Sequence, residues 1–285
     1  MILFKKGEDL NGYLTQKKKE GNQIGFVPTM GALHQGHISL IESSKRISAV
    51  TVCSIFVNPT QFNDPGDFQK YPSTIEQDIY FLESNTTDVL FLPLVEEIYQ
   101  NGTEHLEHYK LGYLETILEG KFRPGHFQGV CQVMKRLIDI VQPDHLLMGQ
   151  KDYQQCMVVK KLLEIMNQPT TFHACPTIRE RDGLAMSSRN LRLSDVERRN
   201  APAIYKALSY LKKNIHLGNL DELLAEAKNI LIQSNFKIDY VEVAEAATLQ
   251  MTHEYTGSQP LVALIAAFQN DVRLIDNMII SGEQN

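Results

Sequence analysis

The stretch PTMGALHQGHISL, residues 28–40, decides the fold. It overlaps the end of an apolar run, QIGFVPT at 23–29, which predicts a buried strand. It leads into GHISLIESSKRIS at 36–48, where the apolar residues recur at helical spacing. A strand, a glycine-containing turn and a helix, in this order, form the unit from which doubly wound α/β sheets are built.

Within this stretch, GALHQGHI nearly matches the phosphate loop GxxxxGK[ST], but His37 and Ile38 stand where lysine and Ser/Thr are required. Without them the loop lacks the fixed charge on the phosphates and the hydroxyl that holds Mg²⁺. A zinc site is disfavoured because His34 and His37 lie three residues apart and flank Gly36. A third interpretation is an anion site at a helix N-terminus, where free backbone N–H groups and both histidines donate to phosphate oxygens. A glycine turn without any ligand is the plain alternative.

Strand and helix patterns alternate over the first 175 or so residues, which predicts right-handed crossovers and a parallel sheet. We expect further strands at 49–57, 88–93, 144–149 and 170–178, and helices at 73–84, 127–141 and 152–166. The pattern then changes to an aperiodic loop at 179–194, helices at 195–215 and 220–234, and strand-like runs at 239–246, 261–268 and 272–280. The predicted fold is therefore a Rossmann-like, doubly wound α/β domain (1–178) followed by a smaller α+β domain (179–285).

Composition narrows the class of protein. Of the 285 residues 43% are hydrophobic and 22% charged, as in soluble globular proteins. A net charge of −6 argues against a nucleic-acid-coating protein. The N-terminus has no apolar signal segment, and the run LVALIAAF at 261–268 is too short to span a bilayer. The four cysteines show no metal-ligand spacing, which predicts buried, reduced thiols. We therefore expect a cytoplasmic protein that binds neither nucleic acid nor membrane.

The spacing His34–x–Gly36–His37 resembles the HIGH-type signature of the nucleotidyltransferase superfamily, whose members attack the α-phosphate of ATP and expel pyrophosphate. Such a fold usually carries a second signature on a downstream loop that closes over the phosphates. MSSRN at 186–190, with two hydroxyls and an arginine on the aperiodic loop, is the expected partner.

Further segments resemble the pantothenate synthetase (pantoate–β-alanine ligase) family almost end to end, from Gly25 to about Ile280. These are VPTMGALHQGHISLI, SIFVNPTQF, YPSTIEQD, LEGKFRPGHFQGV, MGQKDYQQ, RERDGLAMSSRN and VRLIDN, in that order. The resemblance implies a homodimeric, Mg²⁺-dependent ligase on the route to coenzyme A. The carboxylate of (R)-pantoate would attack ATP to give pantoyl adenylate and pyrophosphate, and the amine of β-alanine would then displace AMP.

The resemblance also implies site residues. His37, as proton donor, His34 and Lys151 are the expected catalytic groups, and no metal ligand is assigned. The expected ATP-binding residues are Met30, Gly31, Ala32, Leu33, His34, Gln35, Gly36, His37, Gly149, Gln150, Lys151, Asp152, Ile178, Met186, Ser187, Ser188 and Arg189.

Pantoate would contact Gln61, Gln155 and Asn58. A glutamine amide suits a hydroxy acid because it both donates and accepts hydrogen bonds. Gln155 follows Lys151 by one turn on the predicted helix, which places the two on one face.

Two other functions fit parts of the pattern. A phosphotransferase with a degenerate phosphate loop would release ADP, whereas the family reaction releases AMP. A catalytically idle nucleotide-binding protein would keep the fold alone. In the segment 120–130, GKFRPGHFQGV, Arg123 and His126 are either anion ligands or solvated side chains of a Pro-Gly turn. The resemblance implies that this segment borders the site as a mobile flap.

Overall fold

A parallel sheet forms the centre of the first of two units, Met1–Thr177 and Ile178–Asn285, into which the chain divides. The computed structural model describes residues 1–63, 65–104 and 106–281. Over that part of the chain the sheet has six strands in the order β1-β4-β3-β2-β5-β6, and all printed pairings between them are parallel. They are β1 (Ile2–Phe4), β2 (Ile24–Thr29), β3 (Val50–Ile55), β4 (Val89–Phe91), β5 (His145–Gly149) and β6 (Thr171–Cys175). The predicted Rossmann-like fold is confirmed.

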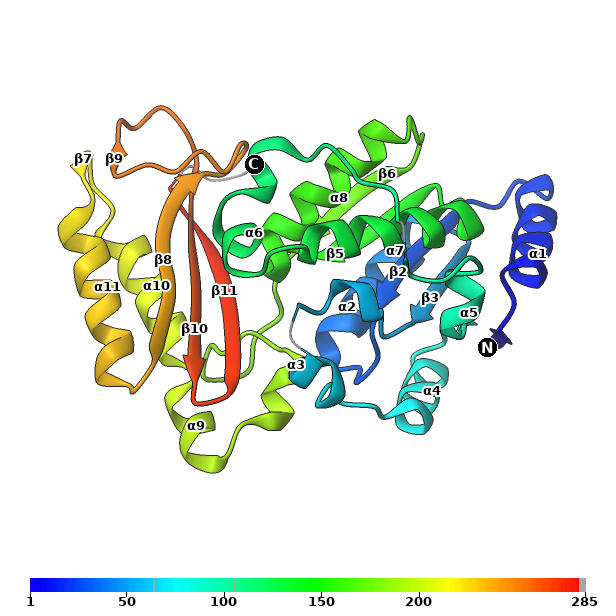
Figure 1. Ribbon diagram of the computed structural model, residues 1–285, viewed down its shortest axis with the longest axis horizontal. Helices are drawn as coiled ribbons and strands as arrows, with labels where there is room; N and C mark the ends of the chain where they lie inside the picture. Colours follow the sequence, from blue (N-terminus) through cyan, green and yellow to red (C-terminus); the bar gives the residue numbers. More distant parts are fainter. Residues whose placement is uncertain (64, 105, 282–285) are drawn as a thin grey trace. The chain divides into compact units, whose positions relative to one another are not determined.

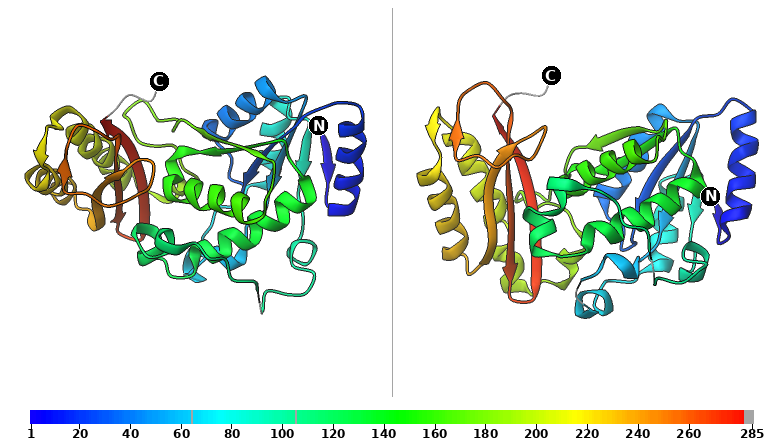
Figure 2. Two further views of the ribbon diagram at one scale, coloured as in Figure 1. Left: turned by 90° about the horizontal axis from the view of Figure 1, so that it is seen from above. Right: turned by 45° about the horizontal axis from the view of Figure 1, so that its top comes forward.

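Helices cover both faces of this sheet (Figures 1 and 2). Alternation along the strands divides the core between the two faces. Phe26, Val52 and Leu146 belong to a core that also holds residues of four helices, which are α1 (Gly7–Lys19), α5 (Val95–Ile98), α7 (His126–Val141) and α8 (Tyr153–Ile165). The next residue of each strand points the other way, as period-2 geometry requires. Val27, Cys53 and Leu147 pack with α2 (Gln35–Ile47) and α4 (Ile75–Ser84).

The strand order reverses between β2 and β5, and these two strands pair only briefly. Their ladder is limited to Gly25 with His145 and Phe26 with Leu146, whereas β2 pairs with β3 along its full length to Thr29. In doubly wound sheets ligands bind at such a reversal, beyond the carboxyl ends of the strands. The early end of the β2–β5 ladder separates the two strands at that position.

Several elements of the first unit, most of them short, have no clear signal in the sequence. Strand β1 has three residues, and α1 carries only Gly7, Leu10 and Leu14 as buried positions. The others are η1 (Pro59–Gln61), α3 (Pro65–Gln69), α5 (Val95–Ile98), η2 (Gly112–Glu115), α6 (Leu118–Phe122) and η3 (Gln150–Asp152). Elements this short give too few turns for an apolar period to be recognised.

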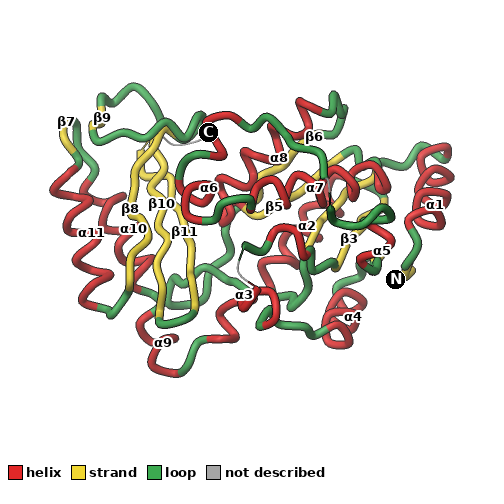
Figure 3. Tube along the Cα trace, viewed as in Figure 1, coloured by secondary structure: helices red, strands yellow, loops and turns green. Residues whose placement is uncertain are grey.

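The second unit is an antiparallel sheet with two helices on one face (Figure 3). Its strands β8 (Lys237–Glu245), β10 (Leu261–Gln269) and β11 (Val272–Ser281) follow the order β11-β10-β8. Helices α10 (Ala203–Asn214) and α11 (Asp221–Gln233) supply the opposing apolar side chains. The remaining elements are η4 (Ser188–Arg192), α9 (Asp195–Asn200), β7 (Gly218–Asn219) and β9 (Glu254–Tyr255).

Two predicted elements differ from the structure. The single helix expected at 195–215 is wrong, because α9 ends at Asn200 and α10 begins at Ala203. Pro202 lies at this break, where its missing N–H and its ring oppose a continuous helix. The strand expected at 170–178 ends at Cys175, since Pro176 cannot donate to the ladder.

The predicted loop at 179–194 is held by a buried ion pair. The two guanidinium nitrogens of Arg179 donate to the carboxylate of Asp276 at 2.5 and 3.1 Å, and Asp276 is 4% exposed. Met186 N–H donates to the carbonyl of Ile178 at 2.9 Å, which closes a hairpin-like turn. The motifs RERDGLAMSSRN and VRLIDN, remote in sequence, therefore meet within the second unit.

Gly129 lets α7 lie directly against η1. A Cβ at this position would come within 2.2 Å of the carbonyl oxygen of Thr60 and 2.6 Å of Gln61 Cα. Both atoms belong to backbone, so a side chain requires one element to move.

We therefore expect Gly129→Ala to destabilise the protein by about 1–3 kcal/mol, as overpacking does, and to lower the melting temperature by roughly 3–10 °C. Gly12→Ala is the matched control, because a Cβ there meets nothing within 4 Å inside α1. That control should match or exceed the wild-type melting temperature. Equal melting temperatures for the two variants would contradict the close packing of α7 on η1.

Candidate active site

A strained turn joins β2 to α2 and is fixed by one buried carboxylate. Gly31 and Ala32 have positive φ of 84° and 48°, which costs energy for alanine. Asp78 of α4 accepts hydrogen bonds from Ala32 N–H at 2.9 Å and Leu33 N–H at 2.8 Å. It is 3% exposed and also accepts from the Thr74 hydroxyl at 3.1 Å. Asp78 thereby holds the backbone of the turn that precedes the two histidines.

His34 and His37 cap the first turn of α2 reciprocally. His34 Nδ1 accepts from Gly36 N–H, and His37 Nδ1 accepts from His34 N–H, each at 3.2 Å. The Gly36 N–H is therefore not a free donor for an anion, which corrects part of the expectation for this helix N-terminus. Because Nδ1 of each ring is an acceptor, each neutral imidazole carries its proton on Nε2. The donors that this turn offers to a phosphate are imidazole Nε2–H groups.

Both imidazoles are uncharged at neutral pH. Burial, followed by the positive charge of Lys151, lowers the pKa of His34 to about 4. Burial, then His34, then Lys151 lower the pKa of His37 well below 6.5. The ring centroids lie 4.1 Å apart, so a second positive charge would be opposed by the first. A neutral His37 donates hydrogen bonds; the negative charge of a bound triphosphate would raise its pKa and favour the proton-donor role.

A second turn follows β5, on the other side of the reversal in strand order. Gly149 is extended, with φ −73° and ψ 129°, and a Cβ on it would meet nothing within 4 Å. The open space at Gly149 is what the approach of a ligand to backbone requires. Lys151 Nζ lies 3.9 Å from Asp152 Oδ1 and is close enough to affect both histidines electrostatically. The structure thus brings Lys151 of the second turn close to both His34 and His37.

Two amide side chains, Gln61 of η1 and its N-cap Asn58, lie beside Met30 of the first turn. Gln61 Nε2 donates to Met30 Sδ at 2.9 Å, and Gln61 Oε1 accepts from Asn58 Nδ2 at 3.1 Å. Gln61 is 9% exposed and Asn58 is 1% exposed, so both amides are buried. Met30 of the first turn is therefore in direct contact with the residue expected to bind pantoate.

Gln155 lies on α8, where its side chain is half-buried and makes no hydrogen bond to any of residues 1–63, 65–104 and 106–281. The expectation that Lys151 and Gln155 share a helix face is wrong, because Lys151 lies in η3 and α8 begins at Tyr153. The neighbouring Gln154 is buried and holds Leu114, Ile117 and Glu119 through three backbone hydrogen bonds.

The remaining predicted ATP residues lie in the second unit. Ile178 and Met186 pair through the hydrogen bond that closes the hairpin-like turn. Ser187 is the N-cap of η4, where its hydroxyl accepts from Arg189 N–H at 3.3 Å, and Ser188 is buried. Their part in ATP binding stays a prediction.

Comparison with known proteins places the chain in a family. The model of pantoate–β-alanine ligase matches residues 2–279. The chain belongs to the pantoate–β-alanine ligase family. The predicted family and its reaction, the ATP-dependent joining of pantoate and β-alanine into pantothenate, are confirmed.

Relatives and solved structures of this ligase family cover nearly the whole chain. The pantothenate synthetase of Cytophaga hutchinsonii is 44% identical over 283 residues, 98% of this chain and 99% of the relative. The structure of pantothenate synthetase from Thermus thermophilus matches with a TM-score of 0.89 at 36% identity, covering 99% and 100% of the two chains. The Francisella tularensis pantoate–β-alanine ligase, complexed with β-γ ATP and β-alanine, matches with a TM-score of 0.83 at 37% identity and covers 99% of each chain.

Three further features of the described residues concern clusters of metal ligands, helices long enough to cross a membrane, and the state of the cysteines. The described residues contain no group of three or more His, Cys, Asp or Glu side chains that could hold a metal ion. In the same part of the chain no helix has both the length and the apolar content that crossing a bilayer requires. All four cysteines are buried free thiols, as predicted.

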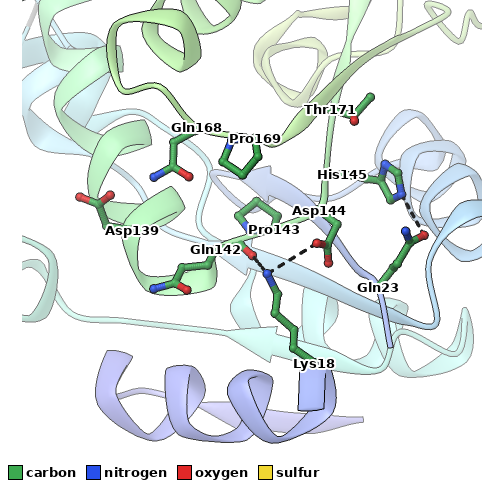
Figure 4. Close-up of a pocket in the computed structure, with 10 residues that line it drawn as sticks. All are labelled: Lys18, Gln23, Asp139, Gln142, Pro143, Asp144, His145, Gln168, Pro169 and Thr171. Carbon is green, nitrogen blue, oxygen red and sulfur yellow. Dashed lines mark hydrogen bonds and ion pairs between the residues drawn. The ribbon is translucent and has the colours of Figure 1, made fainter. Parts of the chain in front are cut away.

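A polar hollow of about 460 Å³ lies at the opposite, amino-terminal edge of the sheet, beside the first residues of β5 and β6 (Figure 4). Its polar groups bind one another. Lys18 Nζ donates to the carbonyl of Gln142 and lies 3.6 Å from Asp144, and a ring nitrogen of His145 lies 3.3 Å from Gln23 Oε1. These contacts join α1 and α7 to the edge of the sheet.

Two residues that hydrogen-bond the backbone of site residues, Asp78 and His126, had no role assigned from the sequence. Asp78 stands in the segment YPSTIEQD, which indicated the family but gave this residue no role. His126 is 5% exposed, and its Nδ1 donates to the carbonyl of Gln61 at 2.8 Å. The solvated interpretation of His126 is therefore wrong, whereas a border of the site agrees with its contact. The place of both residues inside family-like segments was the only available signal.

Protonation of His34 should make folding stability depend on pH. Its folded pKa of about 4 lies below the ordinary value near 6.5, so the unfolded chain binds a proton first as the pH falls. We expect the free energy of unfolding to decrease from pH 7 to pH 5. In His34→Asn, which keeps a capping side chain, the free energy of unfolding should decrease by about 1–2 kcal/mol less than in the wild type over the same range. Urea denaturation at both pH values measures this difference. His216→Asn, at an exposed position, is the control, and an unchanged pH dependence in His34→Asn would contradict the assignment.

Proposed function

We propose that the site at the β2–β5 reversal activates pantoate by adenylation. The carboxylate oxygen attacks the α-phosphorus of ATP, the bond from that phosphorus to the bridging oxygen breaks, and pyrophosphate leaves. The neutral amine of β-alanine then attacks the acyl carbon, and AMP departs with the carboxyl oxygen. AMP is needed because a carboxylate offers an amine no leaving group of comparable quality. The convergence of two histidines and a lysine from two adjacent turns is the observation that carries this proposal.

The proposed roles follow from charge and hydrogen bonding. Lys151 neutralises the phosphates, whereas His34 and His37 donate through Nε2–H to the oxygens on which charge develops as pyrophosphate leaves. Gly149 permits ATP to approach the backbone, and Asp152 accepts from ribose hydroxyls. Gln61 and Gln155 bind pantoate, with Asn58 behind Gln61. Residues 179–285 are the proposed lid domain, and Ile178 and Met186–Arg189 are proposed ATP-binding residues.

Mg²⁺ fits this arrangement as a companion of ATP. An ion held by triphosphate oxygens and water needs few protein ligands, which agrees with the lack of a three-residue acidic or histidine cluster in the described chain. When bound it would neutralise phosphate charge. The carboxylate of Asp78 is already occupied by Ala32, Leu33 and Thr74, so it is a poor candidate ligand.

The resemblance also supports a homodimer in the cytoplasm, which we propose as the working state of the enzyme. Light scattering of the purified protein at micromolar concentration tests it directly. A mass of twice the chain supports the dimer, and a monomer at all concentrations contradicts it.

The products distinguish the proposed reaction from the two alternatives. Incubation with ATP, Mg²⁺ and pantoate should release pyrophosphate in a single enzyme-equivalent burst, and addition of β-alanine should give continuous AMP and pantothenate. A phosphotransferase would give ADP, and an idle nucleotide-binding protein would give no product. Either result would contradict the proposed function.

The role of Lys151 in η3 can be tested against Lys161, a lysine of the following helix α8. We expect Lys151→Ala to slow pantoate-dependent pyrophosphate release by about 10²–10³-fold, because it removes the positive charge nearest the reacting phosphates. Lys161→Ala, where the side chain is exposed and, among the described residues, is paired with Glu164 alone, should stay within about twofold of the wild type. Rapid-quench single-turnover measurement separates this step from product release, and near-normal rates in Lys151→Ala would refute the assigned role.

A further inference from the structure

Tyr99, which follows α5, lies against the amides proposed to bind pantoate, although neither a motif nor the resemblance gives it a role. Its side chain is 3% exposed. Its hydroxyl donates to Asn58 Oδ1 at 2.7 Å and lies 2.9 Å from the Thr60 hydroxyl. Thr60 also donates to Asn58 Oδ1 through its hydroxyl at 3.1 Å. Two hydroxyl groups therefore meet at one amide oxygen.

Backbone groups decide which way the Asn58 amide points. The carbonyl oxygen of Gly129 can only accept, so the atom that faces it at 3.1 Å is Nδ2 of Asn58. The N–H of Thr60 can only donate, and it points to Oδ1 at 3.4 Å. Because Nδ2 has two hydrogens, the second is directed to Gln61 at 3.1 Å.

The orientation of Asn58 in turn fixes Gln61. The Gln61 atom that faces Asn58 Nδ2 must be the acceptor Oε1, which leaves Nε2 with two hydrogens on the other side. One of them meets only the weak acceptor Met30 Sδ. Gln61 therefore presents donors, whereas the sequence alone suggested an amide that both donates and accepts.

Other contacts hold Tyr99 and the backbone of η1 in place. Burial raises the pKa of Tyr99, so its hydroxyl keeps the proton that it donates to Asn58. The guanidinium of Arg136 lies 4.7 Å from the centre of the Tyr99 ring, within the range of a cation–π contact. The Gln61 carbonyl accepts from His126 Nδ1, since Arg123 faces the other ring nitrogen and can only donate.

We propose that Tyr99 and Thr60 are positioning residues that act through Asn58 to keep the Nε2–H donors of Gln61 directed at substrate. The Nε2–H donors of Gln61 favour an oxygen acceptor, namely the carboxylate or hydroxyl oxygen of a hydroxy acid. They disfavour an ammonium or amide N–H group at the same position. This inference rests on the proposed function, in which Gln61 binds pantoate.

Steady-state kinetics of Tyr99→Phe test the proposal, because this change removes one hydroxyl and keeps the ring. We expect the KM for pantoate to rise about fivefold to tenfold, as the loss of one hydrogen bond implies, and the KM for ATP to stay within twofold. Thr60→Val, which removes the second hydroxyl and keeps the branched shape, should raise the pantoate KM in the same direction. Tyr109→Phe is the matched control, since Tyr109 is equally buried but bonds Glu107, and should leave both values within twofold.

A double-mutant cycle shows whether Tyr99 acts through Gln61. In a Gln61→Ala background, Tyr99→Phe should change pantoate affinity, measured by calorimetry, by less than twofold. An unchanged pantoate KM in Tyr99→Phe, equal changes for pantoate and ATP, or the full effect in the Gln61→Ala background would overturn the proposal. Wild-type protein that releases no pyrophosphate with pantoate would instead refute the proposed function, so the two failures are distinguishable.

Discussion

The reversal of strand order between β2 and β5 is the constraint on which the site depends. The two strands pair only through Gly25–His145 and Phe26–Leu146, so their carboxyl ends are not tied to each other. The chain leaves β2 through a turn that ends at His34, the N-cap of α2, with His37 in the first turn of that helix. It leaves β5 at Gly149 and enters η3, which bears Lys151. Groups more than a hundred residues apart in the sequence are thus brought together by topology alone.

The two turns together supply one lysine, Lys151, and two neutral imidazole donors, His34 and His37. Reciprocal capping ties each imidazole to the backbone through Nδ1 and leaves Nε2–H for a ligand. Burial and Lys151 keep both rings uncharged, as the lowered pKa values show. A phosphate loop would have placed its lysine in the first turn. In this chain the lysine comes from the second turn, which frees the first turn to be held by Asp78 and capped by histidine.

Much of this could be predicted from the sequence, because apolar periodicity gave most of the sheet and its helices, and the motif segments gave the family. The parts that could not be predicted rest on long-range contacts. Nothing around Asp78 in the sequence shows that its carboxylate holds Ala32 and Leu33, and nothing around His126 shows that it binds the Gln61 carbonyl. The short 3₁₀ turn at Gln150–Asp152 displaced Lys151 from the expected helix, since three residues leave no periodic pattern. The helix expected at 195–215 runs across Pro202, where the structure breaks it into α9 and α10.

The central claim is that the carboxylate of pantoate attacks the α-phosphorus of ATP. Pantoate labelled with ¹⁸O in its carboxyl group, incubated with the enzyme, ATP, Mg²⁺ and β-alanine, tests it most directly by mass spectrometry of the products. The account predicts one labelled oxygen in AMP and none in pyrophosphate, because the bridging oxygen of the adenylate leaves with AMP when the amine attacks the acyl carbon. Label in inorganic phosphate, or AMP that carries no label, would contradict it.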